Sequence, residues 1–576
     1  MERQWIIAEA QPDDGGIAWS GICDLPCVVN LLRRKGFTCA EEVQAFLQPR
    51  LRSLSDPFLL PNMAAAVERI LQAVDAGERI VLFGDYDVDG VTSLALLSGM
   101  LRASGAEPAL FLPLRMEEGY GLSRESVERC WELHQPQLLI AVDCGTSSVE
   151  EIAELKRRGA DVIVLDHHEP PLRSGCTGEP KEALPDCVAV VNPKIASDCA
   201  LRYLCSAGVV FKVCHALLKR RPLENFDLKA QLDLVALGTV ADIVPLEGEN
   251  RTLVYHGLRQ LNRTSRVGVR KLMEAAGVRG PVCAEDIGYR LGPRLNAAGR
   301  LDTAEQALRL LITEDEHEAE ELAALLEVQN RERQAVEKEI YAAAEEQVAA
   351  NFDPGRDAAL VVGARAWHPG VLGIVASRLM RKYHRPTIVV GFAAAGLGKG
   401  SGRSIEGFSL VAALGCCAEW LEKYGGHEMA AGLALREGNF ARFAEAFRRC
   451  AREQLTEAAL QAPLHLDEEV TLADLNGALL RWHDALEPFG NSNAQPLFFA
   501  RQVEPAAPPE TLKEKHLVLR LRQRNRQMRA IFFGGAEEPL PPPPWDVAFR
   551  VQADEYQGER RLQLQVQAVR AAAGGE

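Results

Sequence analysis

Short apolar runs alternate with helical patterns between residues 80 and 192, and this alternation most restricts the possible fold. The runs are residues 80–83 and those inside "PQLLIAVD", "DVIVLDHH" and "CVAVVNP". Segments with helical periodicity lie between them, for example at residues 149–158. Apolar strands that alternate with amphipathic helices are typical of a parallel sheet covered by helices on both faces. The sequence therefore predicts an α/β fold.

The chain of 576 residues is too long for one hydrophobic core, and about three or four domains are expected. Residues 1–60 form an N-terminal segment without identifiable chemistry, and the parallel-sheet domain is predicted at 61–313. A smaller α/β domain, with a helix from Ser409 to Tyr424, is predicted at 352–456. Short strand patterns and proline-rich turns then predict a β-rich domain, plausibly a small barrel, at 457–576.

The segment between the two α/β domains, residues 314–351, contains neither glycine nor proline. A single helix of this length would span roughly 55 Å, which is longer than a domain core. Such a helix could project as a coiled-coil arm. Because α/β patterns resume on both sides of it, a helix that joins two domains is the preferred interpretation.

Composition excludes several classes of protein. Hydrophobic residues make up 47% and charged residues 25% of the chain, as in ordinary globular proteins. No signal peptide or membrane-spanning run is visible, so a cytoplasmic protein without membrane association is expected. The 14 cysteines lack paired Cys-x-x-Cys spacing, which favours reduced core residues over disulfides or zinc ligands. The net charge of −15 excludes a uniformly basic surface but allows a local basic groove.

Three aspartates at alternate positions, Asp85, Asp87 and Asp89, follow the first apolar run and precede a glycine. The spacing resembles the start of an EF-hand calcium loop, which requires a glutamate at loop position twelve and a helix upstream. Position twelve here is Leu96, and an apolar strand lies upstream. The calcium loop is therefore rejected, and a carboxylate cluster at the end of a strand remains.

Other acidic and histidine residues stand at the ends of the following elements. Asp143 ends "LLIAVD", the triplet beginning at Asp166 ends "DVIVLDHH", and Asp242 lies in "LVALGTVADIVPL". Ligands of doubly wound sheets bind beyond the carboxyl ends of the strands, so these residues are expected to converge on one crevice. So much like charge requires neutralisation, and two divalent cations would provide it. Mixed carboxylate and imidazole ligands suit Mn²⁺ or Mg²⁺, with Zn²⁺ possible, and a metal pair suits phosphoryl displacement.

These motifs resemble those of the DHH phosphoesterase superfamily, in particular its single-strand-specific 5′→3′ DNA exonucleases. Besides "GDYDVDGVTS", "VDCGTSS", "DHH" and "GTVADIVPL", the match includes "RLGPRLNAAGRL", "WHPGVLGIVASRL", "GKGSGRS" and "YGGHEMAAG". The resemblance implies a DHH domain joined by the long helix to a DHH-associated domain, which closes over the substrate. The implied metal ligands are Asp87, Asp89, Asp143, His167 and Asp242, with Asp85 and His168 beside them.

One departure from the ligand pattern of related proteins concerns the second metal ion. Family II pyrophosphatases share the architecture and place a histidine four residues before the equivalent of Asp87, where this chain has Phe83. The second ion therefore either binds weakly or uses Asp85.

The segment "GLGKGSGRS" is predicted to be a loop that binds phosphate through its backbone N–H groups, Ser401 and Arg403. A flexible turn is the alternative. The resemblance implies a pocket for the 5′-phosphate built from Ser401, Arg403 and Arg115. Tyr120 could stack on a base or pack in the core.

Further residues are candidates for substrate binding. By resemblance, His427 in the Gly-Gly-His motif would face the metals from the opposite lobe, although a histidine there could also belong to a simple turn. Arg294, Asn296 and Arg300 in "PRLNAAGR" could grip phosphates or form a solvated surface loop.

The C-terminal domain contains "HLVLRLRQRNRQMRAIFF". On an extended strand, Leu517, Leu519 and Leu521 would face one side, while Arg520, Arg522 and Arg524 would face the other. A basic ladder above an apolar core is what an oligonucleotide-binding (OB) barrel would present to DNA. A solvated sheet face is the alternative.

The predicted function is a single-stranded-DNA-specific 5′→3′ exonuclease of DNA repair and recombination. One alternative is a short-oligonucleotide or cyclic-dinucleotide phosphodiesterase, against which the chain length and the basic tail count. Another is an inactive single-strand-binding relative, against which the complete DHH triplet counts. By resemblance, single-strand DNA-binding protein and repair helicases are expected partners, and a monomer is expected.

Overall fold

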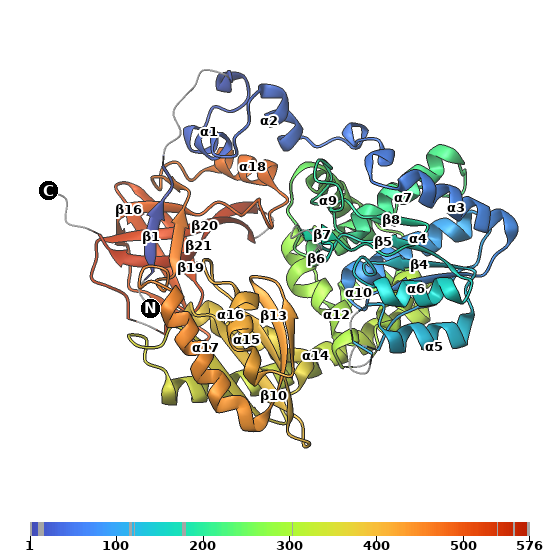
Figure 1. Ribbon diagram of the computed structural model, residues 1–576. Helices are drawn as coiled ribbons and strands as arrows, with labels where there is room; N and C mark the ends of the chain where they lie inside the picture. Colours follow the sequence, from blue (N-terminus) through green and yellow to red (C-terminus); the bar gives the residue numbers. More distant parts are fainter. Residues whose placement is uncertain are drawn as a thin grey trace.

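The computed structural model describes residues 3–9, 17–114, 118–119, 121–174, 180–301, 303–537, 539–556 and 559–572. Figure 1 shows a parallel-sheet domain on the right, joined by helix α14 (Glu316–Asn351) to a second α/β domain at lower left. The C-terminal strands lie on the left, and helices α1 (Pro26–Arg33) and α2 (Ala40–Leu47) lie at the top. The predicted combination of α/β domains with a β-rich C-terminal part is confirmed.

The first domain contains a five-stranded parallel sheet, as the alternating pattern predicts. In spatial order its strands are β3 (Ala109–Phe111), β2 (Ile80–Gly84), β4 (Leu138–Val142), β5 (Asp161–Leu165) and β8 (Ala189–Val191). The first of these strands in the sequence, β2, therefore lies between the second and the third. The strand order reverses at this point, and ligands of open α/β sheets bind at such a switch point, beyond the carboxyl ends of the strands.

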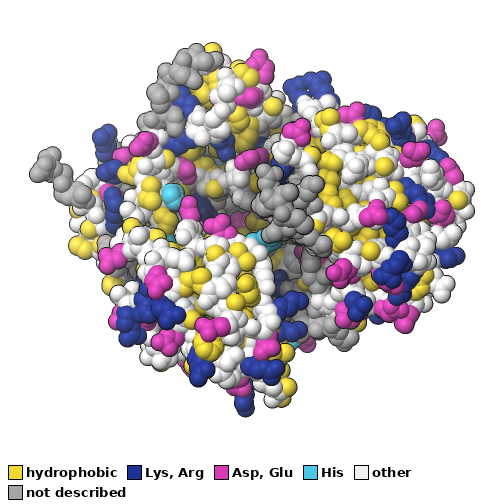
Figure 2. Space-filling model, viewed as in Figure 1, with side chains coloured by type: hydrophobic (Ala, Val, Ile, Leu, Met, Phe, Trp, Pro, Cys, Tyr) yellow, Lys and Arg dark blue, Asp and Glu magenta, His cyan; other side chains and the backbone are white. Residues whose placement is uncertain are grey.

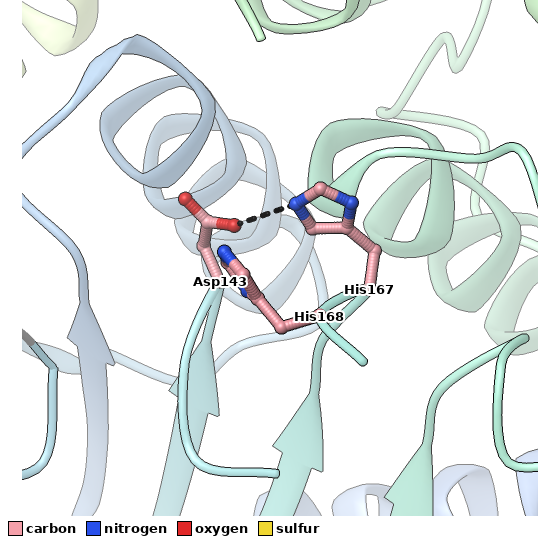
Figure 3. A group of neighbouring side chains, drawn as sticks. All are labelled: Asp143, His167 and His168. Atoms are coloured by element: carbon pink, nitrogen blue, oxygen red, sulfur yellow. Dashed lines mark ion pairs between the residues drawn. The ribbon is translucent and has the colours of Figure 1, made fainter. Parts of the chain in front are cut away.

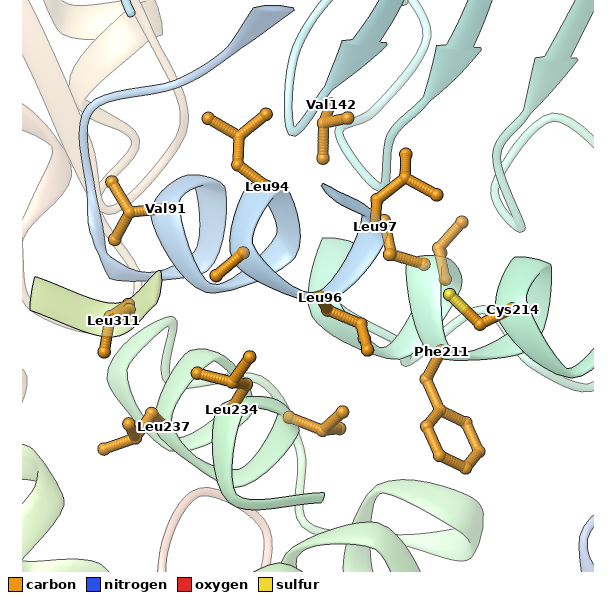
Figure 4. Close-up of a cluster of buried hydrophobic side chains, with 14 of the residues drawn as sticks. Val91, Leu94, Leu96, Leu97, Val142, Phe211, Cys214, Leu234, Leu237 and Leu311 are labelled. Carbon is orange, nitrogen blue, oxygen red and sulfur yellow. The ribbon is translucent and has the colours of Figure 1, made fainter. Parts of the chain in front are cut away.

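Helices cover both faces of this sheet. They include α3 (Met63–Ala76), α4 (Val88–Ala103), α5 (Arg124–His134), α6 (Val149–Arg157), α7 (Ser206–Arg220), α8 (Leu232–Ala241), α9 (Gly248–Leu261), α10 (Val267–Ala275), α12 (Gly292–Leu301) and α13 (Glu305–Ile312). Helix α4 is enclosed by the sheet and by helices α7 and α8, and Figure 4 shows Leu94, Leu96 and Leu97 among their side chains. A helix buried on all sides has no polar face, which explains the apolar sequence of α4.

Helix α14 joins the two α/β domains and is not a projecting coiled-coil arm. Leu322 and Leu326, in its first half, are buried in the core of the parallel-sheet domain. Ile340 and Val348, in its second half, are buried in a separate cluster together with Leu372 of the second domain. Each half therefore has its own apolar partner, and the prediction of a connecting helix is confirmed.

The second α/β domain contains a five-stranded mixed sheet packed against helices. The helices are α15 (Pro369–Tyr383), α16 (Leu410–Cys416) and α17 (Phe440–Gln454). In spatial order the strands are β12 (Lys423–Gly426), β13 (Ala430–Arg436), β11 (Leu397–Arg403), β10 (Thr387–Phe392) and β9 (Leu360–Arg365).

Two elements of this domain differ from the prediction. The predicted glycine-rich loop is strand β11, paired on one side with β10 and on the other with β13. Its glycines occupy every second position because neighbouring side chains fill the space on that face: a Cβ at Gly402 would lie 2.7 Å from Ile388 Cδ1. The helix predicted from Ser409 to Tyr424 ends at Cys416, and the last residues of that segment belong to strand β12.

The C-terminal strands close into a small barrel, as the sequence predicts. The barrel strands are β16 (Phe498–Pro505), β20 (Trp545–Tyr556), β21 (Glu559–Ala571), β19 (Arg526–Phe532) and β18 (His516–Gln523). A short antiparallel pairing between β16 and β18 closes the ring. Val503, Leu519 and Phe549 are buried in its core.

The N-terminal segment packs onto this C-terminal domain. Strand β1 (Gln4–Ile7) pairs in parallel with β14 (Pro463–Leu466). Leu32 of α1 and Val43 of α2 are buried in the same cluster as Leu479 of helix α18 (Gly477–Leu486). The two ends of the chain therefore share one hydrophobic core, which the sequence did not predict.

Within the described residues, no helix is long and apolar enough to cross a membrane. The cysteines in the described ranges are free thiols, most of them wholly or partly buried, in line with the expectation of reduced core cysteines.

A buried ion pair ties the first domain to the segment that precedes it. The side chain of Lys212 on α7 is 0% exposed, and its Nζ contacts Glu249 of α9 and donates hydrogen bonds to Ser55. We expect Lys212→Met to lower the free energy of unfolding by about 3 kcal/mol, because it leaves the carboxylate of Glu249 buried without its counter-charge. Denaturant unfolding followed by circular dichroism measures this loss.

Lys219→Met is the matched control, because Lys219 lies on the same helix and its ion pair with Asp56 is largely exposed. The control should change stability by less than about 1 kcal/mol. Equal unfolding midpoints for the two variants would show that the buried pair contributes no more than the exposed one.

Candidate metal centre

The three alternating aspartates form the turn between β2 and α4. Asp87 is the N-cap of α4, and its Oδ1 accepts hydrogen bonds from the backbone N–H groups of Asp89 (3.0 Å) and Gly90 (3.1 Å). A Cβ at Gly90 would lie 2.3 Å from the carbonyl oxygen of Asp85. The glycine is therefore required because the helix begins directly against the backbone that leaves the strand.

Asp89 is 1% exposed and faces the N-terminus of helix α7. Its carboxylate accepts hydrogen bonds from the backbone N–H groups of Ser206 (2.7 Å) and Ala207 (2.9 Å). Helix α8 also comes close, since a Cβ at Gly238 would lie 2.8 Å from Asp89 Oδ1. Burial and the neighbouring charge of Asp87 nevertheless raise the pKa of Asp89 to about 7.

Asp143 follows β4 at the other side of the switch point. Its φ is +62°, a left-handed conformation that is uncommon for residues other than glycine and is often found at functional sites. Its Oδ1 accepts a hydrogen bond from Ser206 Oγ at 2.8 Å. The carboxylate is buried among other acidic groups, so burial and the charges of Asp89 and its neighbours raise its pKa well above the usual value.

Asp166, the first residue of the DHH triplet, holds the turn after β5. It accepts hydrogen bonds from the backbone N–H groups of Thr146, His167 and His168 and lies 2.7 Å from His168 Nδ1. Burial would raise the pKa of Asp166, but the hydrogen bond and charge of His168 hold it well below its usual range. The side chain of Asn192 donates to the carbonyl oxygen of His168 and stabilises the same turn.

The ring of His167 points toward the carboxylate of Asp143 (Figure 3). Its Nε2 lies 3.5 Å from Asp143 Oδ1, 3.5 Å from Asp242 Oδ2 and 3.9 Å from Asp89 Oδ2. Burial lowers the pKa of His167 to about 3, so the imidazole is neutral and its nitrogen can act as a ligand. Within the described part of the chain, neither ring nitrogen makes a hydrogen bond.

Asp242 completes this group as the C-cap of helix α8. Burial and the charges of Asp89 and Asp87 raise the pKa of Asp242 to about 8. Its Oδ2 is buried and makes no hydrogen bond to a described residue. A cation that neutralises these carboxylates would also interact favourably with the C-terminal end of α8, because the helix dipole is negative there.

Three sets of potential ligands at this edge of the sheet have atoms that all lie within 4.8 Å of one another. Two of them share no residue: Asp89, His167 and Asp242 form one, and Asp85, Asp87 and Asp143 form the other. The third set, Asp143, His167 and His168, shares one residue with each of these two. The donor sets suit hard divalent cations such as Mn²⁺ and Mg²⁺. Phe83 supplies no ligand in place of the pyrophosphatase histidine, because its side chain has no donor atom; its ring is buried and stacks on Phe111 at 5.0 Å.

His168 differs from His167 in its surroundings. Its side chain is 41% exposed, and its ring lies 4.5 Å from that of His167. Burial would lower the pKa of His168, but the hydrogen bond that it donates to Asp166 and the charges of the surrounding carboxylates raise it to about 9. At neutral pH it is therefore a cation at the mouth of the cluster.

The candidate phosphate-binding residues on α12 lie in a helix and not in a loop. Arg294 is engaged with Glu327 of α14, at 2.6 Å between Nε and Oε2, which neutralises its charge. Asn296 is half-buried on the same helix. Arg300 Nη1 donates to the carbonyl oxygen of Gly370 at the start of α15, at the contact between the two α/β domains.

Ser401 and Arg403 lie together on strand β11 of the second domain. Arg403 Nη1 donates to Ser401 Oγ at 3.2 Å, and a Cβ at Gly373 of α15 would lie 2.9 Å from Arg403 Nη2. Arg403 forms no ion pair with any described carboxylate, and burial lowers its pKa. His427 is exposed directly after strand β12, whereas Arg115 and Tyr120 lie outside the described residues.

The basic ladder of the barrel is shorter than predicted. Leu517, Leu519 and Leu521 are buried and alternate with the exposed Arg520 and Arg522, as the strand pattern predicts. Arg524 lies in the turn after β18, with a φ of +51°, because the hairpin reverses there.

Neighbouring charges also alter the ladder. Arg520 and Arg522 each pair with a glutamate of an adjacent strand, Glu510 and Glu504 respectively. Arg529 of β19, which the prediction omitted, lies directly opposite Arg520. Figure 2 shows Lys and Arg interspersed with Asp and Glu over one face of the molecule, without a continuous basic surface.

Several residues that shape the site were not predicted from the sequence. They are Asp166 as the residue that orients the histidine turn, Ser206 and Ala207 as donors to the carboxylates, and Asn192. The motif "VVNP" ends a strand and could have suggested Asn192. The donors at the start of α7 carry no sequence signal, because any residue can supply a backbone N–H.

Comparisons with known proteins agree with this geometry. The family model described as the DHH family, N-terminal domain, matches residues 79–239. The model of the DHHA1 domain matches residues 357–453, and that of the RecJ OB domain matches residues 466–568. The three matches fall on the parallel-sheet domain, the second α/β domain and the barrel.

Curated relatives cover most of the chain. The single-stranded-DNA-specific exonuclease RecJ of Bacillus subtilis is 36% identical over 545 residues, which cover 93% of this chain and 66% of the relative. That of Dickeya dadantii is 37% identical over 476 residues, covering 79% of this chain and 80% of the relative.

A crystal structure of RecJ in complex with Mn²⁺ from Thermus thermophilus superimposes with a TM-score of 0.84 at 31% identity, covering 99% of this chain and 80% of that one. A Mg²⁺ complex from the same organism gives a TM-score of 0.77. With these matches over all its domains, the chain belongs to the RecJ family of the DHH superfamily.

Proposed function

We propose that this protein is a single-stranded-DNA-specific exonuclease that hydrolyses phosphodiester bonds from the 5′ end with Mn²⁺ or Mg²⁺. The observation that carries the proposal is the neutral, buried His167 whose Nε2 faces Asp89, Asp143 and Asp242 at the switch point of the sheet. Bound cations supply charge neutralisation and an activated water for phosphoryl displacement.

The two ligand sets divide the metal centre into two sites. Asp89, His167 and Asp242 would hold one ion, and Asp85 and Asp87 the other. Asp143 belongs to the second set and also lies 3.5 Å from His167, so it is placed to bridge both ions. Asp85 would thus supply a metal ligand in place of the pyrophosphatase histidine, whose position Phe83 occupies here.

The residues around the metal centre position the scissile phosphate. His168, partly exposed and held by Asp166, would place a positive charge beside the phosphate oxygens. Arg300, at the contact between α12 and α15, would bind a neighbouring phosphate. Arg294 is a weaker candidate, since phosphate would have to displace Glu327.

The end of the strand would be recognised by the second α/β domain. Arg403 is a half-buried guanidinium without a carboxylate partner among the described residues, and it is aligned by Ser401. This is the environment in which a phosphate dianion binds strongly. Arg115 would join this pocket, Tyr120 would stack on a base, and His427 would face the metal centre from this domain.

The biological setting is inferred from the family. Single-stranded DNA is the substrate, and the protein is proposed to act in the cytoplasm, as a monomer, in DNA repair and recombination. Single-strand DNA-binding protein and repair helicases are proposed to deliver the substrate. A dinucleotide phosphodiesterase is disfavoured, because such an enzyme has no use for the barrel that follows the two α/β domains.

Product analysis of a 5′-labelled strand of about 40 nucleotides with added Mn²⁺ tests the overall proposal. Early release of short labelled products, and faster cleavage of the long strand than of a dinucleotide, are expected. Preferential cleavage of the dinucleotide would favour the phosphodiesterase alternative, and the absence of any hydrolysis would favour an inactive binding protein.

Asp143→Ala should abolish hydrolysis while binding to single strands is retained. The substitution removes a carboxylate placed between both ion sites, whereas the barrel and Arg403 remain intact. Cleavage rates and fluorescence-anisotropy binding measure the two effects. Asp198→Ala, at an exposed carboxylate, is the control and should behave as the parent. Substantial cleavage by purified Asp143→Ala would contradict the bridging role.

Arg403→Ala should lose most of the preference for 5′-phosphorylated over 5′-hydroxyl strands. The guanidinium provides charge-assisted hydrogen bonds that only the phosphorylated end can accept. Competition between the two substrates measures the preference. Arg365→Ala, on strand β9 of the same sheet and paired with Glu437, serves as the control. If Arg403→Ala discriminates as well as the control does, end recognition lies elsewhere.

Replacing Arg520 and Arg522 with Ser should weaken binding to long strands and flatten its salt dependence. Two lost phosphate contacts reduce the slope of log K against log salt by about 1.4, at roughly 0.7 for each contact with a single strand. Titration of a long strand at several salt concentrations measures the slope. An unchanged slope would mean that Glu510 and Glu504 keep both arginines neutralised and that this face does not bind DNA.

A further inference from the structure

The segment that follows Asp242 is in an unfavourable backbone conformation. Ile243 has a φ of +60°, a region that a β-branched side chain rarely adopts, and its side chain is 70% exposed. Its side chain is not held by apolar burial, while its backbone N–H donates to the carbonyl oxygen of Val240 in the last turn of α8 at 3.3 Å. A conformation of this kind persists only where surrounding contacts impose it.

Further contacts to this segment come from the distant C-terminal domain. The side-chain amide of Asn491 donates a hydrogen bond of 2.7 Å to the carbonyl oxygen of Ile243. In return, the backbone N–H of Leu246 donates to the carbonyl oxygen of Asn491 at 2.9 Å. Gly490 lies against the same segment, since a Cβ there would come within 2.6 Å of Leu246 Cδ1.

The loop that makes these contacts, residues 487–493, is itself fixed to the barrel side of the protein. Asn493 is 2% exposed, and its side-chain amide donates to the carbonyl oxygens of Leu486 and Pro488. Two residues later, Gln495 donates to the carbonyl oxygen of Val551 in barrel strand β20. The loop is therefore a firm support and not a flexible connection.

The parallel-sheet domain also contacts this loop at a second point. Arg251 of α9 is 3% exposed and donates to the carbonyl oxygens of Leu486, Glu487 and Pro488. These bonds fix the start of the loop five residues or fewer from Asn491. The loop 487–493 and the segment after Asp242 are thus held in a fixed position relative to each other.

We propose that Asn491 is a positioning residue for the metal centre: the loop 487–493 holds Ile243 in its strained conformation and thereby aims Asp242 at the metal. The inference rests on the proposed role of Asp242 as a metal ligand. It means that the barrel domain, besides any contact with DNA, supports the segment that follows a metal ligand. Loosening this contact should weaken metal binding without altering the other ligands.

Titration of the full-length protein with Mn²⁺ alone, followed by the electron paramagnetic resonance signal of the free ion, tests this inference. Asn491→Ala should weaken Mn²⁺ binding about three- to tenfold, the factor that corresponds to one lost hydrogen bond. Asn491→Leu, which keeps similar bulk but has no donor, should give the same result. Cleavage at limiting Mn²⁺ should fall by a similar factor and recover at saturating Mn²⁺, with KM for the strand unchanged.

Ser492→Ala is the matched control, since this neighbouring side chain is exposed and makes no hydrogen bond to a described residue. Circular dichroism should give the same thermal midpoint for all variants. Asp242→Asn tests the proposed metal-ligand role of Asp242 separately from the proposed positioning role of Asn491. If it binds Mn²⁺ like the parent, the proposed metal centre is wrong. If it loses Mn²⁺ while Asn491→Ala binds like the parent, the metal centre stands and the positioning role is overturned.

Discussion

Repulsion between buried carboxylates is the constraint on which the rest of this structure depends. Asp89, Asp143 and Asp242 lie around one imidazole, and burial together with the neighbouring carboxylates raises the pKa of each. Hydrogen bonds from the start of α7 stabilise two of them only in part. Divalent cations would neutralise the remaining charge. Metal binding therefore explains the arrangement of these side chains without reference to a substrate.

The parallel sheet explains why this cluster can form. Strands β2, β4 and β5 are neighbours, and each ends at the same edge with an acidic residue or the DHH triplet. The helices that return across the sheet then supply donors to the carboxylates, and Gly238 lets α8 approach close enough to bring Asp242 in. Asp166 orients the histidine turn, while His167, which makes no side-chain hydrogen bond to a described residue, faces the carboxylates.

The remaining domains are connected to the parallel-sheet domain at defined points. Helix α14 has a separate apolar partner in each α/β domain, which sets Arg403 and Ser401 at a defined position relative to the sheet. The loop 487–493 reaches from the barrel to the residues that follow Asp242. The proposed function assigns end recognition to the second α/β domain, strand binding to the barrel and metal binding to the parallel-sheet domain.

The sequence by itself determined the parallel sheet, the long helix, the barrel and the residues at the strand ends, because these follow from local periodicity and from the rule that parallel strands share an edge. It could not determine that "GLGKGSGRS" is a strand, that Arg294 is paired with Glu327, or that Arg524 lies in a turn. It also gave no sign of the contact between Asn491 and Ile243. Each of these depends on a partner far away in the sequence, and only the packed tertiary structure decides which distant groups come within a few ångströms of one another.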